Sequence, residues 1–157
     1  MSLFNGLSEE QLARLDSVAR RRTVEPGTDV VREGEHSYAL FILVSGTVEV
    51  SKRLGSALGT ETHRGLRKTI VRLTAPQFFG EMALLGDTER TATISASDEC
   101  ELLEISEEDF DHLVATDLAL GYRLLYNLAV VLCERLRRTD RDVLKLTAAL
   151  SVALGNR

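Results

Sequence analysis

Glycines divide the middle of the chain into short apolar runs, and this punctuation restricts the fold more than any other feature of the sequence. The runs are rich in Val, Ile, Leu and Thr and occupy residues 30–31, 39–44, 47–50, 69–73, 91–96 and 101–105. Glycines between or beside them lie at positions 27, 34, 46, 55, 59 and 65. Many short strands separated by turns at this spacing are typical of an all-β roll or barrel. From about residue 22 to residue 105 we therefore predict an antiparallel, jelly-roll-like β-roll.

Helical patterns flank this β region on both sides. Over residues 8–20 apolar side chains recur on one face, and Ser8 followed by Gln11 predicts a capping box at the start of that helix. Ser106 with Asp109 predicts the cap of a second, short helix. The predicted fold class is thus mainly β, with an N-terminal helix, a short helix within the β region described below, and helices after residue 106.

A long helix is expected to open at residue 116 or 117. Along it, residues recur alternately four and three positions apart as a heptad seam, and nine of the ten are apolar. The seam positions are Leu118, Tyr122, Leu125, Ala129, Leu132, Leu136, Thr139, Val143, Leu146 and Leu150. This seam predicts a parallel homodimer through the helix. The alternative is a helix that lies on its own β-roll through a wider apolar face at Leu124, Leu128 and Val131, and both arrangements can hold at once.

Composition limits the partners and compartments open to the chain. The net charge of −5 disfavours a dedicated nucleic-acid binder, which would normally be basic. Cys100 and Cys133 are too far apart for a CxxC pair and are expected to be ordinary thiols in a reducing compartment. The N-terminus lacks the pattern of a signal peptide, and the longest apolar stretch, residues 38–44, is too short to span a bilayer. We therefore expect a soluble, cytoplasmic protein that does not engage a membrane.

The sequence carries no recognisable catalytic or metal-binding signal. The histidines His36, His63 and His112 lie in unrelated contexts, without a nucleophile motif or the spacing of metal ligands. We therefore expect a binding protein rather than an enzyme, with no metal and no cofactor.

The segment at residues 78–93, FFGEMALLGDTERTAT, is the most informative part of the chain. Gly80 permits a tight turn, and residues 81–85 can form one helical turn whose free amides favour an anion. Nine residues after Glu81, Arg90 is expected to begin a strand and to offer a planar guanidinium to a phosphate. Two interpretations follow from these residues alone. Either Glu81 and Arg90 form a salt bridge that caps the short helix, or the arginine binds the phosphate of a sugar phosphate while the carboxylate accepts a ribose hydroxyl.

The stretch FGEMALLGDTERTATISA resembles the phosphate-binding cassette of cyclic-nucleotide-binding domains. That family occurs in catabolite activator protein, protein kinase A regulatory subunits and cyclic-nucleotide-gated channels, and its cassette reads roughly F-G-E-[LIM]-[AC]-L, a short spacer, and R-[AST]-A. The resemblance extends to three glycine turns, VEPG, REGE and FILVSG, at residues 24–27, 32–35 and 41–46. It covers about residues 7–136 and implies a β-roll that holds a cyclic mononucleotide, cAMP or cGMP.

The resemblance also assigns roles in binding the sugar and the phosphate. Glu81 would accept the ribose 2′-hydroxyl, with the Gly80 backbone beside it. Arg90 would pair with the charged oxygen of the cyclic phosphate, helped by the backbone amide of Ala83 and by Thr91. The Thr91 hydroxyl could also accept from the exocyclic amine of guanine, so we expect both nucleotides to bind, with at most a small advantage for cGMP.

Recognition of the base is expected to involve Val71, on the strand before the cassette, and Met82, which could add an apolar contact. In the family the long helix closes over the base and contributes a polar or basic side chain. An ungapped comparison places Arg135 there, whereas a shift of four residues places Thr139 and Asp140. The alternative for Arg135 is a structural role in which it pairs with Asp140 of the other helix in a parallel dimer.

We therefore predict two units: a β-roll with short flanking helices over residues 1–116, and a long helix over residues 117–157 that closes the site and dimerises. The predicted function is a regulatory sensor in which a cyclic mononucleotide draws the cassette and the long helix together, altering what an unknown protein partner meets. Only residues 151–157 follow the seam, so we expect no helix-turn-helix module for DNA in this chain.

Three alternatives stay open. The chain is a ligand-free β-roll that serves interaction or dimerisation, an effector domain cut from a larger regulator, or a binder of a different ligand such as a cyclic dinucleotide. Residues 54–68 have no periodicity and are expected to form an inter-strand loop, with partner docking as the alternative interpretation.

Overall fold

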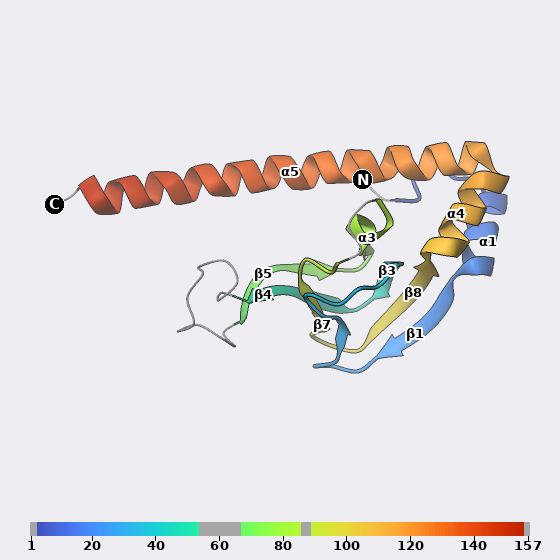
Figure 1. The fold of residues 1–157 in the computed structure, drawn as a ribbon, viewed down its shortest axis with the longest axis horizontal. Helices are drawn as coiled ribbons and strands as arrows, with labels where there is room; N and C mark the ends of the chain where they lie inside the picture. The colour runs from blue at the N-terminus through green and yellow to red at the C-terminus, as the bar shows by residue number, and fades with distance from the viewer. Residues whose placement is uncertain (1–2, 54–66, 86–88, 156–157) are drawn as a thin grey trace.

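In the described part of the chain, eight strands form two four-stranded sheets beside one long helix (Figure 1). The computed structural model describes residues 3–53, 67–85 and 89–155. The first sheet has the strand order β1 (Arg20–Val24), β8 (Cys100–Ser106), β3 (Ala39–Ser45) and β6 (Gln77–Phe79). The second has the order β2 (Asp29–Val31), β7 (Thr93–Ala96), β4 (Thr47–Arg53) and β5 (Arg67–Thr74). Neighbouring strands in both sheets are antiparallel, which confirms the predicted β-roll.

Strand β3 lies between two hydrophobic cores, which explains why it reads as one continuous apolar run. Leu40 and Ile42 point into a core shared with the helices, whereas Phe41 and Leu43 point into a core between the two sheets. This alternation follows from the two-residue period of a strand. The same strand pairs with β6, where Phe41 lies opposite Phe79, so the segment that precedes Gly80 is fixed by the inner core.

The boundaries of some strands differ from those predicted. β1 and the three-residue β6 lie outside the apolar runs, because β1 is mostly exposed and polar and β6 is too short to show a period. The strand expected over residues 91–96 begins only at Thr93, so Arg90 precedes the strand. The reason is a local pairing with the segment before β3: Arg90 N–H donates to Glu35 O at 2.8 Å, and Gly34 N–H donates to Arg90 O at 2.9 Å.

The shorter helices within the described residues are α1 (Glu9–Val18), α3 (Glu81–Leu85) and α4 (Glu107–Thr116). The capping box predicted for the first is confirmed, because Ser8 Oγ accepts from Gln11 N–H at 3.2 Å and Gln11 Oε1 accepts from Ser8 N–H at 3.1 Å. The cap of α4 is confirmed as well, since Asp109 N–H donates to Ser106 Oγ at 3.1 Å. Both helices therefore begin where local side-chain chemistry satisfies their free amides.

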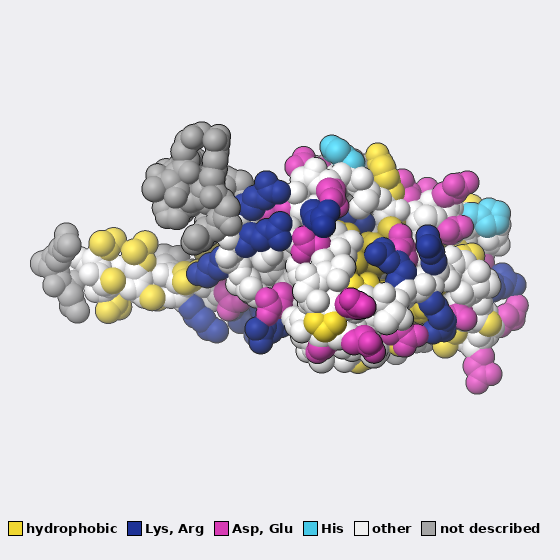
Figure 2. Space-filling model, turned by 90° about the horizontal axis from the view of Figure 1, so that it is seen from below, with side chains coloured by type: hydrophobic (Ala, Val, Ile, Leu, Met, Phe, Trp, Pro, Cys, Tyr) yellow, Lys and Arg dark blue, Asp and Glu magenta, His cyan; other side chains and the backbone are white. Residues whose placement is uncertain are grey.

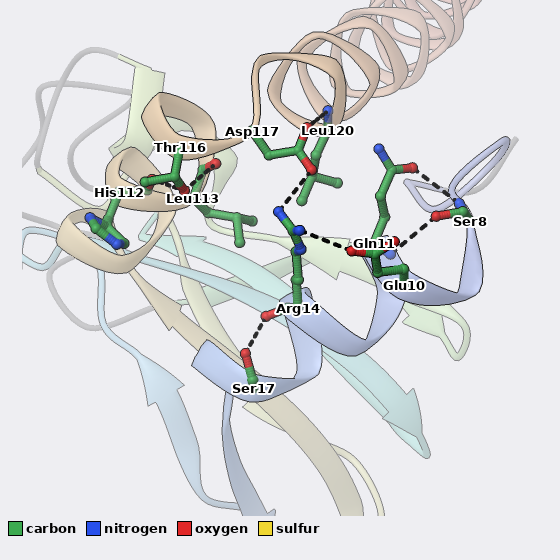
Figure 3. A network of polar contacts seen from close by, with 10 residues as sticks. All are labelled: Ser8, Glu10, Gln11, Arg14, Ser17, His112, Leu113, Thr116, Asp117 and Leu120. Carbon is green, nitrogen blue, oxygen red and sulfur yellow. Dashed lines mark hydrogen bonds and ion pairs between the residues drawn. The ribbon is translucent and has the colours of Figure 1, made fainter.

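Arg14 in α1 connects that helix to the beginning of the long helix α5 (Leu118–Gly155), as Figure 3 shows. Its guanidinium contacts Glu10 Oε1 at 2.9 Å and Asp117 Oδ2 at 3.3 Å. The other oxygen of Asp117 accepts from Leu120 N–H at 3.0 Å and so caps the first turn of α5. These contacts hold the start of α5 against the short helices.

Helix α5 packs on the β-roll through its first half only. Its buried residues are Leu120, Gly121, Leu124, Asn127, Leu128 and Val131. Every described residue after Arg135 is exposed, and Figure 2 shows hydrophobic side chains gathered on that distal part of the helix. The wide apolar face at Leu124, Leu128 and Val131 thus lies on the chain's own β-roll, as the alternative interpretation required. Within residues 3–53, 67–85 and 89–155, no helix is both long and apolar enough to cross a bilayer.

Candidate functional site

A cavity of about 520 Å³ lies between the second sheet, the segment around α3 and helix α5. Its floor comes from the sheets, and its roof from one face of α5. The residues that line it are Val31, Val50, Ile70, Val71, Leu73, Gln77, Phe79, Gly80, Glu81, Met82, Glu89, Arg90, Thr91, Ala92, Ile94, Val131, Glu134, Arg135, Arg138, Thr139 and Asp142. The cavity therefore gathers most of the residues that the sequence singled out for ligand binding.

Gly80 forms the turn between β6 and α3, and no other residue fits there without strain. Its φ is +87°, a conformation that side-chain-bearing residues rarely adopt. A Cβ atom would also lie 2.7 Å from Ala39 O and 2.8 Å from Arg90 Nη1. The glycine thus lets the main chain approach both β3 and the guanidinium of Arg90.

Glu81, the first residue of α3, is buried and makes an ion pair with the long helix. Its Oε1 accepts from Arg135 Nη1 at 2.7 Å, and its side chain is only 8% exposed. Arg135 Nη2 also donates to Phe78 O at 2.6 Å, and the guanidinium lies 4.8 Å from the centre of the Phe78 ring. Arg135 therefore fastens the middle of α5 to both sides of the Gly80 turn.

This arrangement decides between interpretations of the sequence. The alternative of a salt bridge between Glu81 and Arg90 is not found among the ion pairs of the described residues, in which Glu81 pairs with Arg135 instead. Within the chain Arg135 pairs with Glu81, whereas the sequence offered Asp140 of a second helix as its structural partner. Thr139, the other candidate for the base, lies on the cavity lining, while Asp140 is absent from the described lining.

Arg90 is 5% exposed, and all its hydrogen-bond partners among the described residues are neutral. Nε donates to Ser37 Oγ at 2.6 Å, Nη1 to Gly80 O at 3.3 Å and Nη2 to Ala39 O at 2.9 Å. The guanidinium also lies 5.6 Å from the centre of the Phe41 ring. None of the ion pairs within the described part of the chain involves Arg90.

Burial lowers the pKa of Arg90, while the carboxylates of Glu81, Glu104 and Glu35 act from a distance in the opposite direction. An arginine remains protonated in proteins even so, so the cavity contains a buried cation. Each guanidinium nitrogen already donates one bond, and each terminal nitrogen keeps a further N–H. The guanidinium can therefore donate to the oxygens of an anionic group such as a phosphate.

The remaining predicted contacts form the apolar and outer parts of the cavity. Val71 is half-buried on β5, and Met82 is 54% exposed at the edge of α3. Thr91 is exposed, and among the described residues its hydroxyl makes a long contact of 3.8 Å with Met82 Sδ. Ala83 belongs to α3, but its side chain lies outside the described residues.

Ser37 is a site residue that sequence reasoning missed. It lies 53 positions before Arg90 and belongs to no motif, so only the pairing of residues 34–35 with Arg90 brings it to the guanidinium.

The expected loop over residues 54–68 falls mostly outside the described residues, and its last two positions belong to β5. The described residues contain no cluster of His, Cys, Asp and Glu that could hold a metal ion. Cys100 is buried and Cys133 exposed, both as free thiols.

Comparison with known proteins gives consistent results. The family model described as "Cyclic nucleotide-binding domain" matches residues 21–117. The chain is 33% identical over 145 residues to the Cyclic AMP receptor protein of Thermus thermophilus, and the aligned region covers 90% of this chain and 60% of the relative. It is 34% identical over 146 residues to Glutaminase 1 of Bradyrhizobium diazoefficiens, and here the aligned region covers 93% of this chain and 22% of the relative. The chain thus spans less than two thirds of either relative.

The fold has counterparts among solved structures. The catabolite activator protein of Thermus thermophilus superimposes with a TM-score of 0.76 at 32% sequence identity. The superposition covers 92% of this chain and 62% of that one.

Proposed function

The chain belongs to the cyclic nucleotide-binding domain family, and from this premise we propose that it is a sensor of a cyclic mononucleotide, cAMP or cGMP. The observation that carries the proposal is a buried cation, Arg90, that has only neutral partners among the described residues and lines the same cavity as a buried carboxylate, Glu81. A cyclic nucleotide offers the matching groups, an anionic phosphate and an uncharged ribose hydroxyl, next to each other. A simple inorganic anion would match the cation but not the carboxylate that lines the same cavity.

The chemistry of the lining residues supports one orientation of the ligand. The phosphate lies against Arg90, with the backbone amide of Ala83 and the Thr91 hydroxyl beside it. The ribose lies near Gly80 and donates its 2′-hydroxyl to Glu81, whose Oε1 is held by Arg135. The purine then packs on Val71 of the sheet floor and on Met82 of α3, under the polar face of α5.

Sensing follows from the position of Glu81 between the ligand and the long helix. The Glu81 carboxylate that would accept the ribose hydroxyl also forms the ion pair with Arg135 of α5. Ligand binding and the position of the helix are therefore linked. A ligand shifts such an equilibrium only if it binds one arrangement more tightly than the other. We propose that a cyclic mononucleotide favours the arrangement in which α5 closes the cavity.

The role is regulatory, and the chain binds its ligand without changing it. We further propose a cytoplasmic protein that forms a homodimer through α5, acts on a protein partner and does not itself bind nucleic acid or a membrane. Both cAMP and cGMP are expected to bind, with Thr91 and the face of α5 near Thr139 contacting the base.

A second candidate is a ligand-free interaction module, and the exposed apolar residues of the distal α5 favour it. Isothermal titration calorimetry with cAMP, cGMP and a cyclic dinucleotide distinguishes the candidates. Saturable heat with cAMP or cGMP supports the proposed function. Heat with neither mononucleotide contradicts it and leaves the interaction module, or the dinucleotide if that ligand alone binds.

A further inference from the structure

We propose that Ser37 is a positioning residue for the phosphate, because its hydroxyl sets the orientation of the Arg90 guanidinium. The inference rests on the proposed function, since it concerns the same cavity. Ser37 is half-buried in the segment between β2 and β3, and its Oγ lies 2.6 Å from Arg90 Nε.

The segment that carries Ser37 is locked to Arg90 by the main chain. Arg90 N–H donates to Glu35 O at 2.8 Å, and Gly34 N–H donates to Arg90 O at 2.9 Å. On the other side, Tyr38 O accepts from Glu107 N–H at 2.9 Å, at the start of α4. Ser37 is thus held between two anchored neighbours, and its hydroxyl meets Arg90 at a fixed place.

The three hydrogen bonds of the guanidinium come from three different segments. Nη1 is held by the carbonyl of Gly80 and Nη2 by the carbonyl of Ala39, while Ser37 holds Nε. A guanidinium is planar, so one bond at each nitrogen fixes both its position and its plane. Among the described contacts, Ser37 supplies the only bond made by a side chain, and it alone can be removed without altering the backbone.

The acceptor at Nε is neutral, which matters for binding an anion. A carboxylate in its place would form an ion pair and compensate the charge of Arg90 before a ligand arrives. A hydroxyl directs the guanidinium and leaves the charge available, as does the ring of Phe41 below it. The remaining N–H of each terminal nitrogen then presents a defined pair of donors to the phosphate oxygens.

Loss of the hydroxyl would have two effects. The Nε–H of Arg90 would be buried without a partner, and the guanidinium would be free to turn about the side chain. The first effect reduces stability, whereas the second reduces the discrimination between the two exocyclic oxygens of a cyclic phosphate. A purely structural serine would produce only the first.

The test compares Ser37→Thr with Ser37→Val, which have the same shape and differ in the hydroxyl. Each folded variant is titrated with cAMP and with the two phosphorothioate diastereomers, in which sulfur replaces one or the other exocyclic oxygen. We expect Ser37→Thr to bind like the wild type. Ser37→Val should lose about tenfold in cAMP affinity, because binding must then order a guanidinium that the hydroxyl no longer holds in place, and the ratio between the diastereomers should move toward one.

Equal affinities for the two variants, or an unchanged diastereomer ratio in Ser37→Val, would overturn the inference while leaving the proposed function intact. If the wild type binds neither cAMP nor cGMP, the proposed function fails, and the inference fails with it. If Ser37→Val does not fold, an NMR measurement on Ser37→Ala, which needs no nucleotide, tests the same inference. In Ser37→Ala the Arg90 Nε–H should exchange with solvent faster than in the wild type by NMR, and equal exchange rates contradict the role of Ser37.

Discussion

Glu81 and Arg90 are buried in the same cavity, but their charges are compensated differently. Glu81 has a charged partner, Arg135, at 2.7 Å. Arg90 has neutral partners within the described chain, so its cation is stabilised only by dipoles, the Phe41 ring and distant carboxylates. Since an uncompensated buried charge is costly, an anion that enters the cavity gains most from Arg90. The phosphate is therefore expected to contribute strongly to affinity.

Arg90→Ala should lower cAMP and cGMP affinity at least about tenfold while the domain stays folded. A charge-assisted hydrogen bond is worth about 1.5–3 kcal/mol, and about 1.4 kcal/mol corresponds to a factor of ten. Arg72→Ala is the matched control, because Arg72 lies on β5 with a 71% exposed side chain that pairs with Glu49. Calorimetry of both variants checks the prediction, and an unchanged affinity in folded Arg90→Ala would remove Arg90 from the site.

Glu81→Ala should weaken binding of cAMP far more than binding of 2′-deoxy-cAMP, because only the ribose form offers the hydroxyl that the carboxylate accepts. The same substitution also removes the partner of Arg135 and loosens α5. Arg135→Ala separates the two effects, since it loosens the helix but keeps the carboxylate. We expect Arg135→Ala to weaken both ligands to a similar extent. Equal losses for the two ligands in Glu81→Ala would mean that Glu81 has a structural role only.

The distance in sequence determines which site residues can be predicted. Gly80, Glu81 and Arg90 lie within one short segment, so residue type and spacing identify them. Ser37 lies 53 positions from its partner Arg90, and Arg135 lies 54 positions from its partner Glu81. Their contacts depend on the pairing of residues 34–35 with Arg90 and on how α5 lies over α3. Neither arrangement can be read from the sequence pattern. It therefore named Arg135 only through the family resemblance, as a contact of the base, and did not predict its ion pair with Glu81.

At the scale of elements, the signals that predicted the fold are local ones. Glycine turns and capping residues determine where most strands and helices begin, and both predicted caps formed. The position of the N-terminal segment has no such signal. Asn127 of α5 is 1% exposed and donates to Leu3 O at 2.7 Å and to Asn5 O at 2.9 Å. A polar residue on an apolar helix face thus tethers the first residues of the described chain to the long helix.

Asn127→Leu should lower the free energy of unfolding by about 1–3 kcal/mol, because two backbone carbonyls lose their donor in a buried place. Urea unfolding followed by circular dichroism measures the change. Asn5→Ala is the control, since Asn5 is exposed and the substitution keeps the carbonyl that Asn127 binds. We expect the control to unfold at the wild-type urea concentration. A wild-type midpoint for Asn127→Leu would show that the tether adds no stability.

At the scale of the whole molecule, α5 presents one face to the β-roll and its seam to solvent, and the seam position Thr139 also lines the cavity. One face of the first half is buried on the β-roll, whereas seam residues such as Leu118, Tyr122 and Leu146 are 77%, 67% and 70% exposed. Exposed apolar residues at heptad spacing are stable in water when a second helix covers them. The ligand cavity and the seam thus share one rigid element. A change at Arg135 would then be transmitted along α5 to whatever lies on the seam.

We predict that the chain forms a parallel dimer through this seam, with a dimeric mass by light scattering at micromolar concentration. Leu146→Asp should raise the dimer dissociation constant at least about a hundredfold, because each buried leucine contributes about 1.5–3 kcal/mol and the dimer loses one from each chain. Leu144→Asp is the control, since Leu144 is 69% exposed two positions away but lies off the seam. Both variants should keep the thermal stability of the β-roll, because the described residues after Arg135 are exposed and do not support it. A monomeric wild type, or equal weakening by both substitutions, would exclude the seam as the interface.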